Sequence, residues 1–231
     1  LQLAPFATWL TSSIRRVRTD CTFNQALGDK DIQGWVNSAD VDPYGVDIHH
    51  ATNTLPFRHG EVLVEALFAQ HWSTLRGMDL PVERLVFTKE LQNGKWDLRT
   101  DSVFDTVNAL NLTKEAWHNF RQMSNGLWKV DGHGHVRFLT GQPLGTWGSF
   151  AVLTLQNALY AEMAIQFVGE QIRKQLPGLT GKARAKALNV LWDITHNVQY
   201  YILGDDVVFK HASVARIYIQ ILQGYKVPLS P

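Results

Sequence analysis

Three aspartates occupy the positions in this chain that best suit metal chemistry. Asp47 ends a short strand-like run, and Asp205 and Asp206 occupy the tip of a predicted hairpin between residues 198–203 and 207–209. Two such strands lying side by side would bring Asp47 within a few ångströms of Asp205. Carboxylate oxygens suit Mg²⁺, and two ions about 3.5–4 Å apart can clamp both oxygens of a phosphoryl transfer. Taken alone, Gly204-Asp205-Asp206 also fits an ordinary tight turn.

A second candidate segment is a loop bounded by Gly141 and Gly145 that runs through Thr146 into a long predicted helix. Glycine has no Cβ, so the backbone of such a loop can approach a bound strand or nucleotide closely. By itself the loop is equally consistent with a plain turn at the start of a helix.

The surrounding pattern predicts an α+β fold, because hairpins rather than βαβ repeats separate the helices. Hairpin turns are predicted at Asn93-Gly94, at Asp131-Gly132 and at 204–206, while residues 19–40 are interpreted as a loop. Helices are expected over 6–18, from about 54, and over 103–123, 147–175, 183–194 and 213–223, the last ending at Gly224.

Composition restricts the classes of protein that remain. The chain has 231 residues with a formal net charge of +1, so nucleic-acid binding would have to rest on local basic clusters. A single Cys excludes a disulfide framework and a Cys-rich zinc site. The most apolar stretch, residues 150–167, includes Gln156, Asn157 and Glu162, which indicates a buried helix rather than a membrane span.

Four segments together resemble mitovirus RNA-dependent RNA polymerases. Residues 47–56 resemble their first palm motif, 141–150 their second and 201–208 their third, while 20–25 is similar to a short segment before the first motif. The order and rough spacing agree over nearly the whole chain. Two positions depart from the family pattern: Asn53 replaces the usual Asp, and Gly148 stands where Ser is usual.

This resemblance implies a right-hand polymerase palm core with part of the fingers, a small antiparallel sheet flanked by helices, and nucleotidyl transfer copied from an RNA template. Asp47 and Asp205 would hold two Mg²⁺ ions, or Mn²⁺, with Asp206 in support. Asn53 and Ser149 would sense the ribose 2′-hydroxyl. The residues expected along the nucleotide and the nascent pair are Gly141, Gln142, Gly145, Thr146 and Ser149.

The resemblance also sets expectations for extent and setting. Residues 1–231 are interpreted as one catalytic-core fragment, inactive alone, with fingers insertions at about 73–135 and with the thumb and an upstream basic segment absent. The partners would be an RNA template, its product and nucleoside triphosphates. The setting would be the mitochondrion of a host cell, most typically a fungal one.

Two other hypotheses remain open on the sequence. One is an inactive polymerase relic that only folds or binds RNA, suggested by Asn53 and Gly148. The other is a metal-dependent hydrolase, which requires His49 or His50 to converge with Asp47 on one ion. His133 and His135 could bind a metal, or they could simply lie at a flexible hairpin tip. Six basic residues could contact phosphates in the template channel, or they could lie on solvated helix faces; they are Arg15, Arg16, Arg18, Lys182, Arg184 and Lys186.

Overall fold

A three-stranded antiparallel sheet forms the centre of the fold in the computed structural model, which describes residues 3–15, 17–76 and 103–230. The strands are β1 (Tyr44–Val46), β4 (Tyr200–Leu203) and β5 (Asp206–Phe209), in the order β1-β5-β4. Val46 pairs with Val207, and Leu203 pairs with Asp206. The predicted hairpin beside the strand at 44–48 is therefore confirmed, whereas the one at Asn93-Gly94 lies outside the described residues.

The two faces of this sheet are covered differently, as the alternation of strand side chains requires. Helices α6 (Ser149–Gln175) and α8 (Ala212–Gly224) cover one face. The opposite face packs against Cys21 and against Trp35 of α2 (Asp29–Val36). The strand residues on the α6–α8 face are Tyr200, Ile202, Val207 and Phe209, and those on the opposite face are Tyr201 and Val208.

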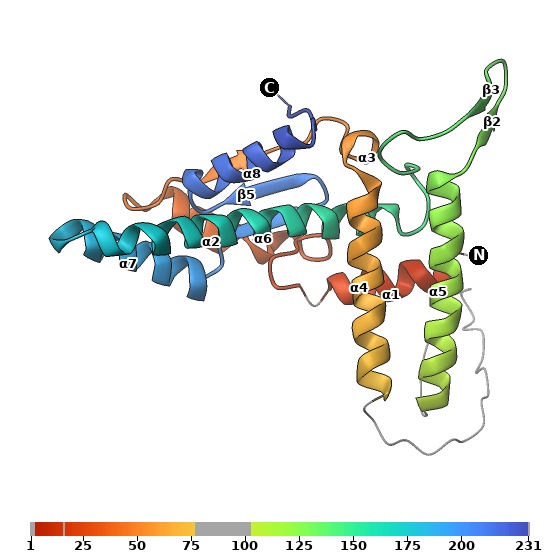
Figure 1. The fold of residues 1–231 in the computed structure, drawn as a ribbon, viewed down its shortest axis with the longest axis horizontal. Coiled ribbons are helices and arrows are strands. Elements are labelled where there is room, and N and C mark those ends of the chain that lie inside the picture. The colour runs from red at the N-terminus through yellow and green to blue at the C-terminus, as the bar shows by residue number, and fades with distance from the viewer. Residues whose placement is uncertain (1–2, 16, 77–102, 231) are drawn as a thin grey trace.

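A second core lies beyond the sheet, where α1 (Ala4–Ile14), α4 (Phe57–Arg76) and α5 (Val103–Asn125) meet the first turn of α6. Phe6 stacks among the rings of Trp117 and Phe120 there. Figure 1 shows α4 and α5 side by side, with α6 running from them across the sheet. Because its residues enter both cores, α6 is the element that joins the helical part to the sheet.

The remaining elements connect these two parts. A short helix α3 (Ala51–Thr54) follows β1, and a small hairpin of β2 (Trp128–Val130) and β3 (Gly134–Val136) projects beside α5. Single 3₁₀ turns lie at Gln25–Leu27 and Leu176–Gly178, the second leading into α7 (Gly181–His196). Within the described residues, no helix combines the length and the apolarity that crossing a bilayer requires.

The hairpin predicted at Asp131-Gly132 is confirmed, with a three-residue loop, since Val130 pairs with Gly134. Two other local expectations were wrong. Residues 29–36 form α2 rather than loop, because the indole of Trp35 buries against Tyr201 while acidic residues begin the helix. The residue beyond α8 with a left-handed backbone is Lys226, at φ 60°, and Gly224 belongs to the helix itself.

Candidate active site

The three aspartates lie at one end of the sheet. Gly204 and Asp205 form a two-residue turn, and Gly204 supplies the positive φ of +65° expected at its first position. Continuing the β1–β5 register one residue beyond Val46 and Val207 places Asp47 opposite Asp206. Facing residues in an antiparallel pair have Cα atoms about 4.5–5.5 Å apart. The fold therefore brings the strand-end carboxylates together from two distant parts of the sequence.

Burial and the neighbouring aspartates both raise the pKa of Asp206. Partial burial is the larger cause, and repulsion from the negative charges of Asp205 and Asp47 adds to it. A divalent cation at this edge would relieve that repulsion, and Mg²⁺ in proteins typically takes one or two carboxylates plus substrate phosphates. Facing each other across β1 and β5, Asp47 and Asp206 could supply the one or two carboxylates that Mg²⁺ bound together with a nucleotide requires.

Asn157, on α6, holds the backbone of the Gly204-Asp205 turn. Its side chain is completely buried, and its Nδ2 donates to the carbonyl oxygens of Gly204 at 2.9 Å and Asp205 at 3.0 Å. The hydroxyl of Tyr218, on α8, donates in turn to Asn157 Oδ1. The turn is thus fixed through its backbone, which leaves the carboxylates free for a ligand.

Phe150 adds a steric constraint on the same turn. A Cβ added at Gly204 would lie 2.7 Å from the Phe150 ring, so only glycine allows the turn to rest on the first turn of α6. Neither Asn157 nor Phe150 was singled out as a site residue on the sequence. The sequence did offer one signal for Asn157, which is a polar residue within the most apolar stretch of the chain.

The segment after α8 fixes the backbone of Asp47. Ser230 N donates to Asp47 O at 3.0 Å, and His49 N donates to Pro228 O at 3.0 Å. Ile48 and Leu229 form an antiparallel bridge between the two segments. Residues 228–230 therefore act as a further strand-like edge beside Asp47, which nothing in their sequence indicated.

The 141–146 loop docks on α3 directly after Asp47. Gly141 N donates to Leu55 O at 3.0 Å, and Gln142 N donates to Thr52 O at 2.7 Å. Gly141 has φ +77°, and a Cβ there would lie 2.3 Å from Thr52 O. The close approach that this glycine allows is thus to the chain's own backbone, and it places the loop beside the acidic edge.

The predicted sugar-sensing residues lie in different environments. Asn53 is exposed on α3, whereas Ser149 is 2% exposed and its Oγ lacks a hydrogen-bond partner within the described structure. Gln142 Nε2 donates to the carbonyl oxygen of Ser149 at 2.6 Å, which ties the loop to the start of α6. Gly145 is exposed, and Thr146 Oγ1 donates to Pro143 O at 3.0 Å.

Gly148, which replaces the usual Ser, has a packing reason. Its φ is +94°, and an added Cβ would lie 2.7 Å from the ring of Phe6. A side chain at this position would strain the backbone and displace a core phenylalanine. The departure from the family pattern at Gly148 therefore has its reason in the packing of Phe6, on α1, against this position.

The histidines do not complete a metal site with the aspartates. His49 and His50 are exposed with ring centroids 3.9 Å apart, and His133 and His135 lie on the exposed β2–β3 hairpin. In the part of the chain that the structure describes, no three His, Cys, Asp or Glu side chains are grouped to hold one ion, and this includes the three aspartates. The convergence that the hydrolase hypothesis requires is not seen among these residues.

The two predicted basic clusters lie in separate places. The Arg15 guanidinium sits over the Phe23 ring, 4.5 Å from its centroid, and Arg16 lies outside the described residues. Lys182, Arg184 and Lys186 lie on the first turns of α7, at the end of the molecule away from α4 and α5.

Comparison with known proteins connects the hairpin to a family. Residues 185–231 match the family model described as mitovirus RNA-dependent RNA polymerase. This segment is similar to mitovirus polymerases. The polymerase-like segment includes most of α7, the β4–β5 hairpin with Asp205 and Asp206, and α8, while Asp47 and the 141–150 loop lie outside the match. No curated protein and no solved structure matches the chain.

Proposed function

We propose that this chain forms the palm core of an RNA-directed RNA polymerase, with Asp47 and Asp205 as the principal ligands of two Mg²⁺ ions. One observation carries the proposal. The hairpin that matches the polymerase family pairs through β5 with β1, so Asp47 lies next to the acidic turn of the polymerase-like segment. Asp206 supports the site by adding negative charge at the same edge.

Bound at these carboxylates, the two ions, or Mn²⁺ in their place, would activate the RNA 3′-hydroxyl and neutralise charge on the incoming triphosphate. The protein's own part is to hold the ligands rigidly. Asn157 fixes the turn that carries Asp205, and residues 228–230 fix the backbone of Asp47. The partners would be an RNA template, its product and nucleoside triphosphates.

Next to this edge, the docked loop would line the nascent base pair. Gly141 and Gln142 are held on α3, and Gly145 and Thr146 extend from them. Asn53, exposed on α3, is the better placed of the two candidates for the ribose 2′-hydroxyl, because Ser149 is buried. The family further suggests replication of a viral RNA in the mitochondria of a fungal host.

Primer extension on an RNA template with the full-length protein tests this proposal. We expect Asp205→Ala and Asp47→Ala each to abolish nucleotide addition without lowering the melting temperature, since neither side chain fills a core. The double variant should be hardly worse than either single one, because groups that act as a unit are non-additive. Asp40→Ala, at an exposed aspartate away from the edge, is the matched control.

Robust extension by Asp205→Ala would overturn the assignment, and inactivity of the unmodified protein would favour the inactive-relic hypothesis instead. The sugar assignment is tested separately by incorporation of paired ribo- and deoxyribonucleotides. Asn53→Ala should lose a hydrogen bond to the ribose 2′-hydroxyl that is worth about 1–3 kcal/mol. Its preference for ribonucleotides over deoxyribonucleotides should therefore be about 5–150-fold smaller than that of the unmodified protein. Ser149→Ala should change it less, and an unchanged ratio in Asn53→Ala would place sugar recognition elsewhere.

A further inference from the structure

The far end of α6 and the first turns of α7 carry a run of cationic side chains without acidic ones. Between Gln171 and Trp192 the sequence has five cationic side chains and no acidic one, although the whole chain carries a net charge of only +1. All five are exposed, and none has an ion-pair partner among the described residues. They are Arg173, Lys174, Lys182, Arg184 and Lys186.

An exposed apolar and aromatic stripe runs through this basic surface. Leu188, Trp192 and His196 recur every four residues, so they share one face of α7. The Trp192 side chain is 58% exposed, and its ring stacks on that of His196 with centroids 4.9 Å apart and planes 15° apart. A flat ring system is therefore held open to solvent, and Arg184 lies one helical turn before Leu188 on the same face of α7.

Arg173, at the end of α6, completes a shallow groove of about 470 Å³ along this stripe. The other residues that line the groove come from α7: Leu188, Asn189, Leu191, Trp192, Thr195 and His196. A guanidinium on one wall and an indole on the other is an arrangement suited to a phosphate and its adjoining base.

This groove is separate from the acidic edge. Arg173 lies sixteen residues beyond Asn157 on the same helix, which at 1.5 Å per residue is about 24 Å from the residue that contacts the Gly204-Asp205 turn. Figure 1 shows α7 at the end of the molecule opposite α4, α5 and the β2–β3 hairpin. A ligand in the groove is therefore not a ligand of the proposed catalytic site.

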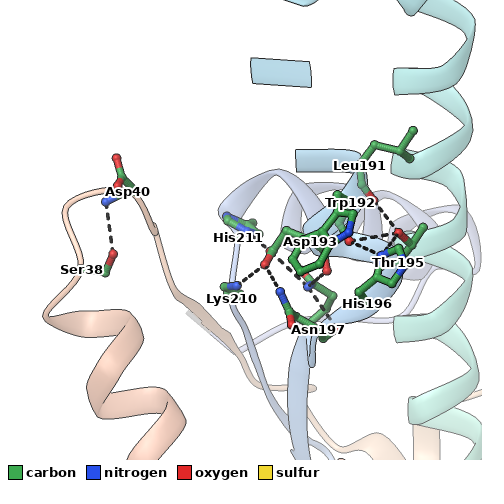
Figure 2. Close-up of polar contacts among 11 residues, drawn as sticks. Ser38, Asp40, Leu191, Trp192, Asp193, Thr195, His196, Asn197, Lys210 and His211 are labelled. Atoms are coloured by element: carbon green, nitrogen blue, oxygen red, sulfur yellow. Dashed lines mark hydrogen bonds and ion pairs between the residues drawn. The ribbon is translucent and has the colours of Figure 1, made fainter. Parts of the chain in front are cut away.

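The helix is held firmly enough to present a fixed surface. Asp193, on the face of α7 turned towards the sheet, accepts hydrogen bonds from Lys210 Nζ at 2.6 Å, Asn197 Nδ2 at 2.7 Å and His211 Nε2 at 3.1 Å. Figure 2 shows these donors gathered around Asp193. This network ties α7 to the end of β5 and leaves its basic face to solvent.

We propose that this groove, with Trp192 at its centre, is a second binding site for single-stranded RNA, outside the catalytic site. Bases stack on the exposed Trp192–His196 pair, and the phosphates lie against Arg173 and the α7 cations. The stacking and charge argument applies to any single-stranded nucleic acid. Only the choice of RNA rests on the proposed polymerase function.

Membrane attachment is the competing use of a basic amphipathic helix, and the burial of α7 disfavours it. Ile194 is buried and Val190 and Leu191 are half-buried, so most of the large apolar side chains face the protein rather than solvent. Leu188 and Trp192 are the two large apolar side chains of α7 that remain exposed. Insertion into a bilayer needs a broader apolar face.

Fluorescence anisotropy with a labelled 15-nucleotide oligouridine tests the proposal on the full chain, without nucleoside triphosphates. We expect Lys182→Ala/Arg184→Ala/Lys186→Ala to weaken binding at least tenfold at low salt, and to reduce the slope of log K against log salt by about 2. Lys30→Ala/Lys114→Ala/Lys129→Ala, at exposed lysines elsewhere, is the matched control and should bind as the unmodified chain does. Equal effects of the two triple variants would overturn the proposal.

Two further measurements separate stacking from charge. Trp192→Ala should weaken binding by about 5–150-fold, corresponding to one stacked base, while Trp192→Phe should restore most of the loss. Equal binding by the Trp192→Ala variant, or tighter binding of anionic phosphatidylglycerol vesicles than of the oligouridine, would overturn the site. The same assay in an Asp205→Ala background should be unaffected, so failure of this site and failure of the polymerase proposal are distinguishable.

Discussion

Carboxylates lie at both ends of the β4–β5 hairpin, on the hairpin itself at the turn and on α7 at the open end, and the protein surrounds them in opposite ways. At the turn, Asp206 faces the charges of Asp205 and Asp47, and its pKa is raised. At the open end, burial opposes the ionisation of Asp193, but donors from Lys210, Asn197, His211 and Gln199 hold the pKa of its carboxyl well below the usual range. Only three residues of β5 separate Asp206 from Lys210, which belongs to the second environment.

Whether neighbouring donors compensate the charge of a carboxylate distinguishes an ion pair that stabilises the fold from a site that suits a cationic ligand. Donors around Asp193 compensate its charge, so the ionised carboxylate stabilises the fold and has no capacity left for a cation. At the turn, compensation by a lysine or arginine would occupy the carboxylate oxygens that the proposed Mg²⁺ ions would need. Asn157 avoids this by binding backbone carbonyls instead of carboxylates.

Replacing Asn157 should have the largest effect on stability. Asn157→Ala removes the donor to two buried carbonyl oxygens and leaves the Tyr218 hydroxyl unpaired, so we expect a loss of about 3–5 kcal/mol in unfolding free energy. Nucleotide addition should fall as well, because the turn that carries Asp205 would loosen. Denaturant unfolding measures the first effect, with Asn111→Ala at an exposed position of α5 as the control.

Tyr218→Phe separates the two roles of Asn157. It leaves the two carbonyl bonds in place and removes only the hydroxyl that supports them, so a smaller loss of about 1 kcal/mol is expected. If Asn157→Ala and Tyr218→Phe were equally mild, the turn would not depend on this clamp.

At the opposite end of the hairpin, Asp193→Ala should cost about 2–3 kcal/mol. The substitution leaves the Lys210 ammonium, with only 14% of its side chain exposed, without its carboxylate partner. Thermal unfolding checks the loss, and Asp40→Ala is an aspartate control in a region that Figure 2 shows apart from the network. A change in melting temperature no larger than that of the control would mean that the network contributes no net stability.

Acidification should change the unfolding free energy in opposite directions through Asp193 and through Asp206. The depressed pKa of Asp193 means that its stabilisation is present above the unfolded value, about 3.9, and is lost as pH falls through that value towards the folded one. The raised pKa of Asp206 means that its ionised form destabilises the fold, and protonation removes that cost as pH falls. Unfolding free energy should therefore depend less steeply on pH below about 4 in Asp193→Asn. In Asp206→Asn it should depend more steeply on pH just above about 4, between the unfolded pKa of an aspartate and the raised folded pKa of Asp206. Parallel curves for both variants and the unmodified protein would contradict these assignments.

The smallest expected effect is a gain. Asp206→Asn removes one of three mutually repelling charges at an exposed position, so stability near pH 7 should rise by about 0.2–1 kcal/mol, discounted for solvent screening. For a chain of this size, that corresponds to a rise of up to about 4 °C in melting temperature. Saturating Mg²⁺ should raise the melting temperature of the unmodified protein more than that of the variant. A destabilised Asp206→Asn protein would show that Asp206 stabilises the fold rather than serving the site.

Local rules were sufficient where the chemistry of a few adjacent residues decides the conformation. Gly204-Asp205 specifies a tight turn because glycine alone readily adopts positive φ, and the β-rich runs on either side pair into the hairpin. Apolar periodicity likewise predicted helices over 147–175 and 213–223, and the structure has α6 and α8 there with bounds that differ by one or two residues. Residues 29–36 were missed because their helix depends on Trp35 reaching Tyr201, a contact between distant segments.

By itself, the sequence determined the acidic turn, its strands and the resemblance of residues 201–208 to a polymerase motif, since each depends on neighbours in the chain. Tertiary structure alone decided that Asp47 lies opposite Asp206, that Asn157 and Tyr218 hold the turn, and that residues 228–230 run beside Asp47. It also decided that the basic face of α7 lies far from the acidic edge. Strand register, burial and long-range hydrogen bonds depend on packing between segments remote in sequence, and no local spacing encodes them.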